Sequence, residues 1–198
     1  MLYTLIIKTI GLSLIAHVVA LEKSQALTSD ESGVRSQTNG RRRRNAEDDI
    51  TSEDIQNIVD LTNQYRRNVV PGSASDMQHL EWNDELADLA QQWADRCSFS
   101  HGTVDNDYPD PIEQNLDTNE LADNNLPDNF ITESIESWNS NGNYYDYNSS
   151  TCDPGRHCYL YHKQVWASAN SIGCGIKSCT YLERNIGFFN CYFAPVQG

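Results

Sequence analysis

Six cysteines constrain the fold of this chain more than any other feature of its sequence. All of them lie beyond residue 96: Cys97, Cys152, Cys158, Cys174, Cys179 and Cys191. An even number of cysteines in a small domain from an oxidising compartment indicates three disulfides, with fifteen pairings open from the sequence alone. No two cysteines are spaced as Cys-x-x-Cys, so the sequence gives little support to a zinc ribbon or a thioredoxin-like site.

The N-terminal residues predict entry into the secretory pathway. An apolar run from Leu2 to Ala20 is too short and too interrupted to span a membrane, and it ends in a small-residue cleavage pattern. We interpret residues 1–20 as a signal peptide. An N-terminal anchor is the alternative, which is disfavoured because no second apolar stretch follows. The chain is therefore expected to be secreted and extracellular, with no membrane span.

A basic run follows the leader. Residues 21–40 are polar and too poor in large apolar groups to fold alone, and they precede Arg41, Arg42, Arg43 and Arg44. Such a run can bind nucleic acid or heparin, but in a secreted chain a site for a proprotein-processing protease explains it better. We predict a propeptide over residues 21–44 and a mature domain over residues 45–198.

Loss of the leader makes the domain strongly acidic. Seven of the 14 basic residues but only three of the 28 acidic residues precede Asn45, and the whole chain already carries a net charge of −14. A negative field argues against nucleic acid and anionic membranes as partners. It permits basic partners or weak calcium association, although solubility alone is a sufficient reason for it.

One N-glycosylation acceptor sequence is present, Asn148-Ser149-Ser150. It lies among turn-forming residues, where an oligosaccharide could be attached to Asn148.

Three helices are predicted from capping signals and apolar spacing. Thr51-Ser52-Glu53-Asp54 resembles a helix start, and Pro71-Gly72 would end that helix. A second helix is expected to begin at Asn83, with acidic residues in its first turn. A third, shorter helix is expected around Ile131, Ile135 and Trp138.

The remaining segments predict loops and strands. Residues 102–129 are dominated by Asp, Asn and Pro and indicate a long irregular connection. Tyr159–Ala167, Ile172–Ser178 and Gly187–Phe193 are β-branched or aromatic and are separated by turn signals, which favours strands. Helices followed by antiparallel strands indicate an α+β domain with helices packed on a small sheet.

Three stretches together carry a family resemblance. They are residues 60–67 with 80–83, 93–97 and His101-Gly102; residues 165–175, Val-Trp-Ala-Ser-Ala-Asn-Ser-Ile-Gly-Cys-Gly; and residues 191–195, Cys-Tyr-Phe-Ala-Pro. In this order and spacing the chain resembles the CAP superfamily of cysteine-rich secretory proteins, wasp venom antigens and plant pathogenesis-related proteins (the SCP domain). The resemblance implies a three-layer α-β-α sandwich with a small antiparallel sheet, stabilised by disulfides.

The resemblance also implies a disulfide pairing. The cysteine after Trp-Ala typically pairs with the one shortly after Ile-Gly-Cys, which implies Cys97–Cys179. Ile-Gly-Cys itself typically joins the last strand, which implies Cys174–Cys191 and leaves Cys152–Cys158 as a local loop. Each bridge should stabilise the domain by about 2–4 kcal/mol.

The cleft of the family commonly holds two histidines and two acidic residues, which suit a divalent ion such as zinc. The equivalent positions in this sequence are His101, Gln114, Asn141 and Leu160. Only His101 keeps the family residue type, because an amide and a leucine do not replace a carboxylate and an imidazole as ligands. The metal site is therefore expected to be degenerate, with no resident cofactor.

A different set of residues could still form a metal site in place of the family-equivalent positions. If residues 159–167 form a strand, His162 shares a face with Leu160, although it lies about 6–7 Å further along. His101, Glu113 and His162 could then hold zinc. The alternative is that His162 is a surface histidine and His101 a cleft residue held by hydrogen bonds.

The resulting functional hypothesis is a non-enzymatic, secreted CAP-domain protein that binds an extracellular protein or lipid ligand. No Gly-x-Ser-x-Gly elbow is present and the cysteines are accounted for by disulfides, so a catalytic nucleophile is not indicated. The alternatives are a lipid or sterol carrier, a venom allergen-type toxin and, less favoured, a metal-dependent protease that would need the missing cleft residues.

Overall fold

The computed structural model describes residues 50–69 and 75–196, which all lie in one compact unit, Arg41–Gly198. The proposed signal peptide (1–20), the propeptide (21–44) with its four arginines, and the Pro71-Gly72 helix stop lie outside the described residues. Within the described ranges, no helix has both the length and the apolar character needed to cross a bilayer.

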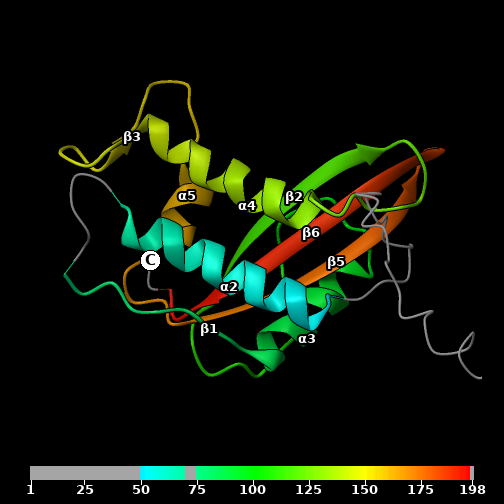
Figure 1. Ribbon diagram of the computed structural model, residues 1–198, viewed down its shortest axis with the longest axis horizontal. Helices are drawn as coiled ribbons and strands as arrows, with labels where there is room; N and C mark the ends of the chain where they lie inside the picture. Colours follow the sequence, from blue (N-terminus) through cyan, green and yellow to red (C-terminus); the bar gives the residue numbers. More distant parts are fainter. Residues whose placement is uncertain (1–49, 70–74, 197–198) are drawn as a thin grey trace, which may run out of the picture. The chain divides into compact units, whose positions relative to one another are not determined.

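The described residues alternate between helices and strands before ending in a long hairpin (Figure 1). The helices are α2 (Ser52–Arg67), α3 (Asp84–Ala94), α4 (Phe130–Ser140) and α5 (Tyr159–Gln164), with a 3₁₀ turn η1 (Asn141–Tyr144). The strands are β1 (Glu81–Trp82), β2 (Glu113–Leu121), β3 (Tyr145–Asp146), β4 (Thr151–Cys152), β5 (Ser171–Tyr181) and β6 (Arg184–Ala194).

The main sheet has the strand order β1-β5-β6-β2. β5 and β6 form an antiparallel hairpin and β2 runs antiparallel to β6, whereas the two-residue β1 pairs with β5 in parallel. Side chains alternate between the two faces of each strand. Ile172, Cys174 and Ile176 therefore face one core, while Cys179 faces the other.

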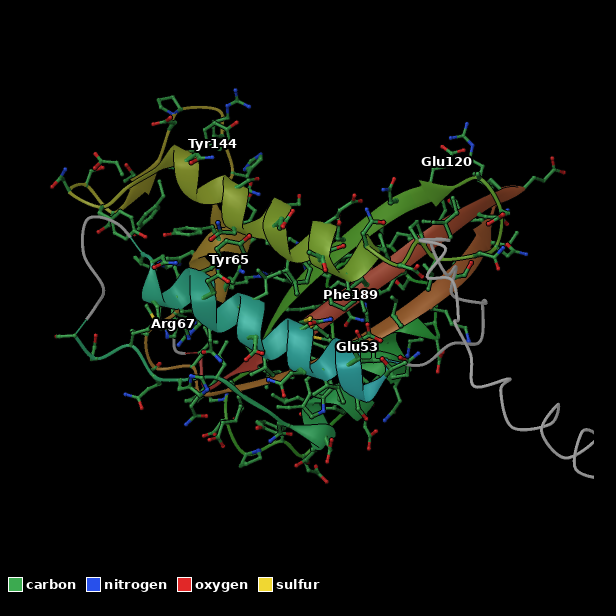
Figure 2. All side chains as sticks on the ribbon, viewed as in Figure 1. Glu53, Tyr65, Arg67, Glu120, Tyr144 and Phe189 are labelled. Carbon is green, nitrogen blue, oxygen red and sulfur yellow. A yellow bond between two sulfur atoms is a disulfide. The ribbon has the colours of Figure 1, made fainter. Side chains whose placement is uncertain are left out.

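Helices cover both faces of this sheet. α3 packs closely on β5, because a Cβ atom at Gly173 would lie 2.2 Å from the backbone nitrogen of Ala87, so only glycine permits the approach. α2 and α4 pack against each other over the opposite face, and α5 contacts α4 (Figure 1). On that face Phe189 lies on the sheet (Figure 2), stacked on Trp138 at 5.4 Å between ring centroids. The predicted three-layer α-β-α sandwich of the α+β class is confirmed.

Three disulfides join the described cysteines in the pairing that the resemblance implies: Cys97–Cys179, Cys152–Cys158 and Cys174–Cys191. Cys174 and Cys191 are direct cross-strand partners in the β5–β6 ladder, so this bridge lies inside the sheet. Cys97–Cys179 fastens the end of α3 to β5 across 82 residues of sequence.

The predicted helix starts are confirmed. Thr51 accepts a hydrogen bond from the N–H of Asp54, and the Asp54 carboxylate accepts one in return from the N–H of Thr51, which makes a capping box. The Asn83 side chain accepts the N–H of Leu86 at the start of α3. Each cap supplies about 1 kcal/mol. The third helix also forms, although Asn129 at its start makes no side-chain cap.

Two predictions about loops and strands are wrong. Residues 102–129 are not wholly irregular, since Glu113–Leu121 forms β2, paired along its whole length with β6. Tyr159–Gln164 is a helix instead of a strand. In both cases tertiary contacts override local preference: β2 has no apolar alternation but completes the sheet edge, and α5 buries Tyr161 and Gln164.

A buried arginine ties several of these elements together. The Arg66 side chain on α2 is 1% exposed, and its Nη atoms donate to four backbone carbonyls, those of Gln78, Gln164, Trp166 and Ala169, at 2.8–3.0 Å. Burial lowers the pKa of Arg66 to about 10, so the guanidinium remains charged at neutral pH. Arg66 therefore connects α2 to the segment before β1 and to the connection between α5 and β5.

Replacement of Arg66 by Met should destabilise the domain strongly. It removes the donors of four carbonyl groups, and each buried acceptor left unsatisfied costs about 1–3 kcal/mol. We expect the free energy of unfolding to fall by at least about 3 kcal/mol. Arg67 is adjacent but exposed, so Arg67→Met should change it by less than about 0.5 kcal/mol. Urea unfolding followed by tryptophan fluorescence measures both variants, and equal losses would contradict the structural role of Arg66.

Candidate functional site

The family-equivalent cleft positions come from four separate parts of the fold. His101 lies in the loop after α3, Gln114 near the start of β2, Asn141 at the end of α4 and Leu160 in α5. The contacts of each side chain decide what this arrangement can do chemically.

Gln114 is buried and acts as a hydrogen-bonding link within the fold. Its Oε1 accepts the N–H of Gly102 at 3.0 Å, and its Nε2 donates to Asn190 Oδ1 at 3.1 Å and to the Tyr192 hydroxyl at 3.4 Å. Tyr192 in turn donates to the Gly102 carbonyl at 2.7 Å. This network uses both the donor and the acceptor of the Gln114 amide and fixes the loop that follows His101 to the sheet.

Glu113 and Asn115 lie on the opposite face of β2 from Gln114, toward α5. The Glu113 carboxylate is 3.1 Å from Lys163 Nζ, and the same ammonium donates to the Gln114 carbonyl at 3.1 Å. Asn115, which is fully buried, donates to the Leu160 carbonyl at 2.7 Å. The first residues of β2 are therefore fastened to α5 by one ion pair and two hydrogen bonds.

The other two equivalent positions have structural contacts. Asn141 Nδ2 donates to the Ser137 carbonyl at 2.8 Å, which satisfies a carbonyl at the end of α4. Leu160 packs its partly buried side chain against the main apolar core. Neither residue offers a charged oxygen or an imidazole to a ligand.

The two histidines of the substitute site do not share the geometry that the sequence predicted. His101 and His162 are both exposed. Because α5 is a helix, His162 and Leu160 point about 200° apart around its axis, and the same-face argument fails. Among the described residues, no three His, Cys, Asp or Glu side chains form a group that could hold a metal ion, so His101, Glu113 and His162 are not brought together.

An aromatic cluster lies beside these residues, and sequence reasoning missed it. We call it the α5 aromatic cluster: Tyr145, Tyr147, Tyr161, His162 and Trp166. The Tyr145 ring lies 4.7 Å from Tyr147, 6.2 Å from Tyr161 and 5.6 Å from His162 between centroids, and His162 lies 5.0 Å from Trp166. The hydroxyls of Tyr147 and Tyr161 are hydrogen-bonded. The signal was the density of tyrosines between residues 144 and 161.

The cluster affects two kinds of titrating group. His162 is exposed as a residue, but the desolvation of its ring beside Tyr145 and Trp166 lowers its pKa, which favours the neutral imidazole at physiological pH. Burial also raises the pKa of Tyr161, and both burial and the hydrogen bond to Tyr161 raise that of Tyr147. The rings of the α5 aromatic cluster are therefore uncharged at neutral pH, although charged side chains such as Asp146 and Lys163 lie beside them.

A second region is the seam, or packing interface, between helices α2 and α4. Tyr65 projects from α2 on this side (Figure 2), where partial burial and the nearby Glu136 carboxylate raise its pKa. The seam is lined mainly by core residues, including Ile131 and Ile135 of α4.

Comparison with known proteins places this geometry in a family. The family described as CAP, cysteine-rich secretory protein family, matches residues 59–193. Peptidase inhibitor 16 of Mus musculus is 33% identical over 150 residues, which cover 74% of this chain and 28% of that protein. Cysteine-rich secretory protein 1 of Mus musculus is 35% identical over 146 residues, covering 70% and 54%. The chain thus spans just over a quarter of the first relative and about half of the second.

Solved structures agree on the fold. Schistosoma mansoni venom allergen-like protein 4 matches with a TM-score of 0.57 and 25% identity, covering 75% of this chain and 92% of that one. NaASP2 with Zn²⁺ matches with a TM-score of 0.55 and 17% identity, covering 75% and 82%. The chain belongs to the CAP, or cysteine-rich secretory protein, family.

A divalent ion does not fit the side chains at the equivalent positions. Gln114 directs its amide N–H groups toward Asn190 and Tyr192, and Leu160 has no donor atom. The one carboxylate at the start of β2, that of Glu113, is already paired with an ammonium. These contacts leave a cation neither the charge nor the ligand number that a zinc site uses.

Replacement of Gln114 by Glu should destabilise the domain in a pH-dependent way. A carboxylate there would face Asn190 Oδ1, whose orientation is fixed because Asn190 Nδ2 donates to the Ala90 and Gly175 carbonyls. Burial should raise the folded-state pKa of this new carboxyl above its unfolded value of about 4.3, so the penalty appears as pH rises through that range. We expect a loss of about 2–3 kcal/mol at pH 7 and a smaller one at pH 4.

Urea unfolding at both pH values, relative to the wild-type protein at the same pH, measures this effect. Gln92→Glu is the control, because Gln92 is exposed on α3. A Gln114→Glu loss that does not depend on pH would contradict the proposed contact with Asn190.

Proposed function

We propose that this protein is a secreted, non-catalytic binding protein of the extracellular space. The observation that carries the proposal is that three of the four family-equivalent cleft positions, Gln114, Asn141 and Leu160, have structural contacts in place of free acidic or imidazole groups. A hydrolase needs a base, a nucleophile or a metal-bound water held near the substrate. Of these positions, only His101 could supply such a group.

The accessible side chains of the α5 aromatic cluster, Tyr145, Tyr147, His162 and Trp166, form the surface that we propose for contact with a protein partner, whereas Tyr161 is buried. Tyrosine and tryptophan are enriched at the centres of protein interfaces, because they bury a large apolar area while keeping a polar tip. Beside the cluster, Tyr159 is 52% exposed and its ring lies 5.3 Å from His157. The name of the peptidase inhibitor 16 relatives makes a peptidase one class of partner to test.

The mature protein should not cleave peptides. We expect no products from a mixed peptide library at neutral pH, with added zinc or with EDTA, and no change in a His101→Ala variant. Mass spectrometry of the library detects cleavage. His157→Ala, which alters another exposed histidine, is the control. Cleavage by the wild-type protein that disappears in His101→Ala but persists in His157→Ala would refute the non-catalytic assignment.

We further propose the secretory route that such a role requires. It consists of a signal peptide over residues 1–20, a propeptide removed after Arg44 and an N-linked oligosaccharide on Asn148. Asn148 is exposed in the turn between β3 and β4, where its N–H donates to Asp146 Oδ1 at 2.9 Å. Exposed turns of this kind are accessible to the glycosylation machinery.

Secretion from eukaryotic cells tests this route. We expect a product that begins at Asn45 and loses mass on enzymatic removal of N-linked oligosaccharide. Ser150→Ala should abolish that mass loss because it destroys the acceptor sequence, whereas Ser149→Ala should preserve it. Intact mass before and after deglycosylation gives the result. A retained oligosaccharide in Ser150→Ala would place the modification elsewhere.

The same secreted protein also tests the alternative of lipid carriage. A bound sterol or fatty acid in its native mass spectrum would favour lipid carriage over protein binding.

A further inference from the structure

The environment of Lys163 differs from that of an ordinary surface lysine. Its side chain is 21% exposed, and its Nζ reaches both the Glu113 carboxylate and the Gln114 carbonyl at 3.1 Å. Two of its three donors are therefore used on the first two residues of β2. The Glu113 side chain is 47% exposed. Lys177 pairs with Asp95 at 3.3 Å, and these two side chains are 37% and 51% exposed, so the two pairs differ mainly in the burial of the lysine.

The position of this ammonium matters because Glu113 adjoins Gln114, which stands where the family has an acidic cleft residue. A second cation at the Glu113 carboxylate would be repelled by Lys163 at short range, and partial burial reduces the screening of that repulsion. A divalent ion would have to displace a side chain that already has two partners.

A lysine in the chain also differs from a bound ion in its availability. The stabilisation that a metal supplies depends on its free concentration relative to its dissociation constant. The Lys163 ammonium is part of α5 and is present whenever the protein is folded. It can therefore join β2 to α5 without any ion from the surroundings.

We infer that the Lys163 ammonium neutralises the Glu113 carboxylate in place of a divalent cation and joins β2 to α5 by an internal ion pair, so that this junction forms without metal. The inference rests on the proposed function, because the junction adjoins the same non-catalytic site. The link between β2 and α5 is a new role for Lys163, which is not one of the four family-equivalent cleft residues. The His101, Glu113 and His162 zinc site is its direct competitor, since both would use the Glu113 carboxylate.

The first test uses zinc chloride on the wild-type mature protein. We expect the thermal unfolding midpoint to be the same in zinc and in EDTA, because no site gains occupancy in the folded state. A saturable rise of the midpoint with zinc that is lost in His101→Ala and in Glu113→Gln would overturn the inference. That outcome would still leave the peptide-cleavage assay to decide whether the protein is catalytic, so the two proposals fail separately.

The second test is a pair of double-mutant cycles. Lys163→Met, Glu113→Gln and their combination are compared with Lys177→Met, Asp95→Asn and their combination, by urea unfolding. We expect the Lys163 and Glu113 losses to be non-additive, with the double variant losing clearly less than the two single losses together. The losses at the more exposed Lys177–Asp95 pair should be closer to additive.

Salt provides a check within the same experiment. The coupling of Lys163 and Glu113 should persist in 0.5 M sodium chloride, about three times physiological ionic strength, because the Lys163 side chain is only 21% exposed. Additive losses for Lys163 and Glu113 would overturn the inference. If Lys163→Met does not fold, Glu113→Gln alone decides: a loss no larger than that of Asp95→Asn would also overturn it.

Discussion

The arrangement of the described domain depends on one buried guanidinium. Arg66 is almost fully removed from water, and its hydrogen bonds end on four backbone carbonyls in two separate segments, one at Gln78 and three within residues 164–169. A charge in this position is costly to bury, so it is tolerated only because carbonyl dipoles surround it. The result is a fixed distance between α2, the segment leading into β1, and the turn that carries the chain from α5 to β5.

This constraint reaches the candidate site through α5. A helix of six residues has no stability of its own, so its position is imposed by its contacts. Arg66 holds the carbonyl of Gln164 at one end, the Cys152–Cys158 disulfide precedes the other, and Asn115 holds the Leu160 carbonyl between them. Lys163 meets Glu113 because α5 is fastened at these points.

The sequence predicted the features that arise within a few residues of one another. The caps at Thr51 and Asn83 join residues three positions apart, and both were predictable. β2 was not, because its polar sequence forms a strand only by pairing with β6, and Gln114 finds its partner Asn190 76 residues away. α5 was misinterpreted since aromatic residues favour strands when packing is unknown. The resemblance located the equivalent cleft positions, but the role of Lys163 follows only from the contact between β2 and α5.

The two faces of β2 explain how Gln114 and the Glu113–Lys163 pair act together to fix the start of this strand. Gln114 connects one face to the loop after His101 and to β6, and it needs an amide because it both donates and accepts. Glu113 connects the other face to α5 and needs a cation, which Lys163 supplies. A carboxylate at position 114 would disrupt the first connection, and a metal at Glu113 would compete with the second. The start of β2 is thus fixed on both faces, because the side chains there satisfy one another's hydrogen bonds and charges. This rigidity is the property expected of a binding surface.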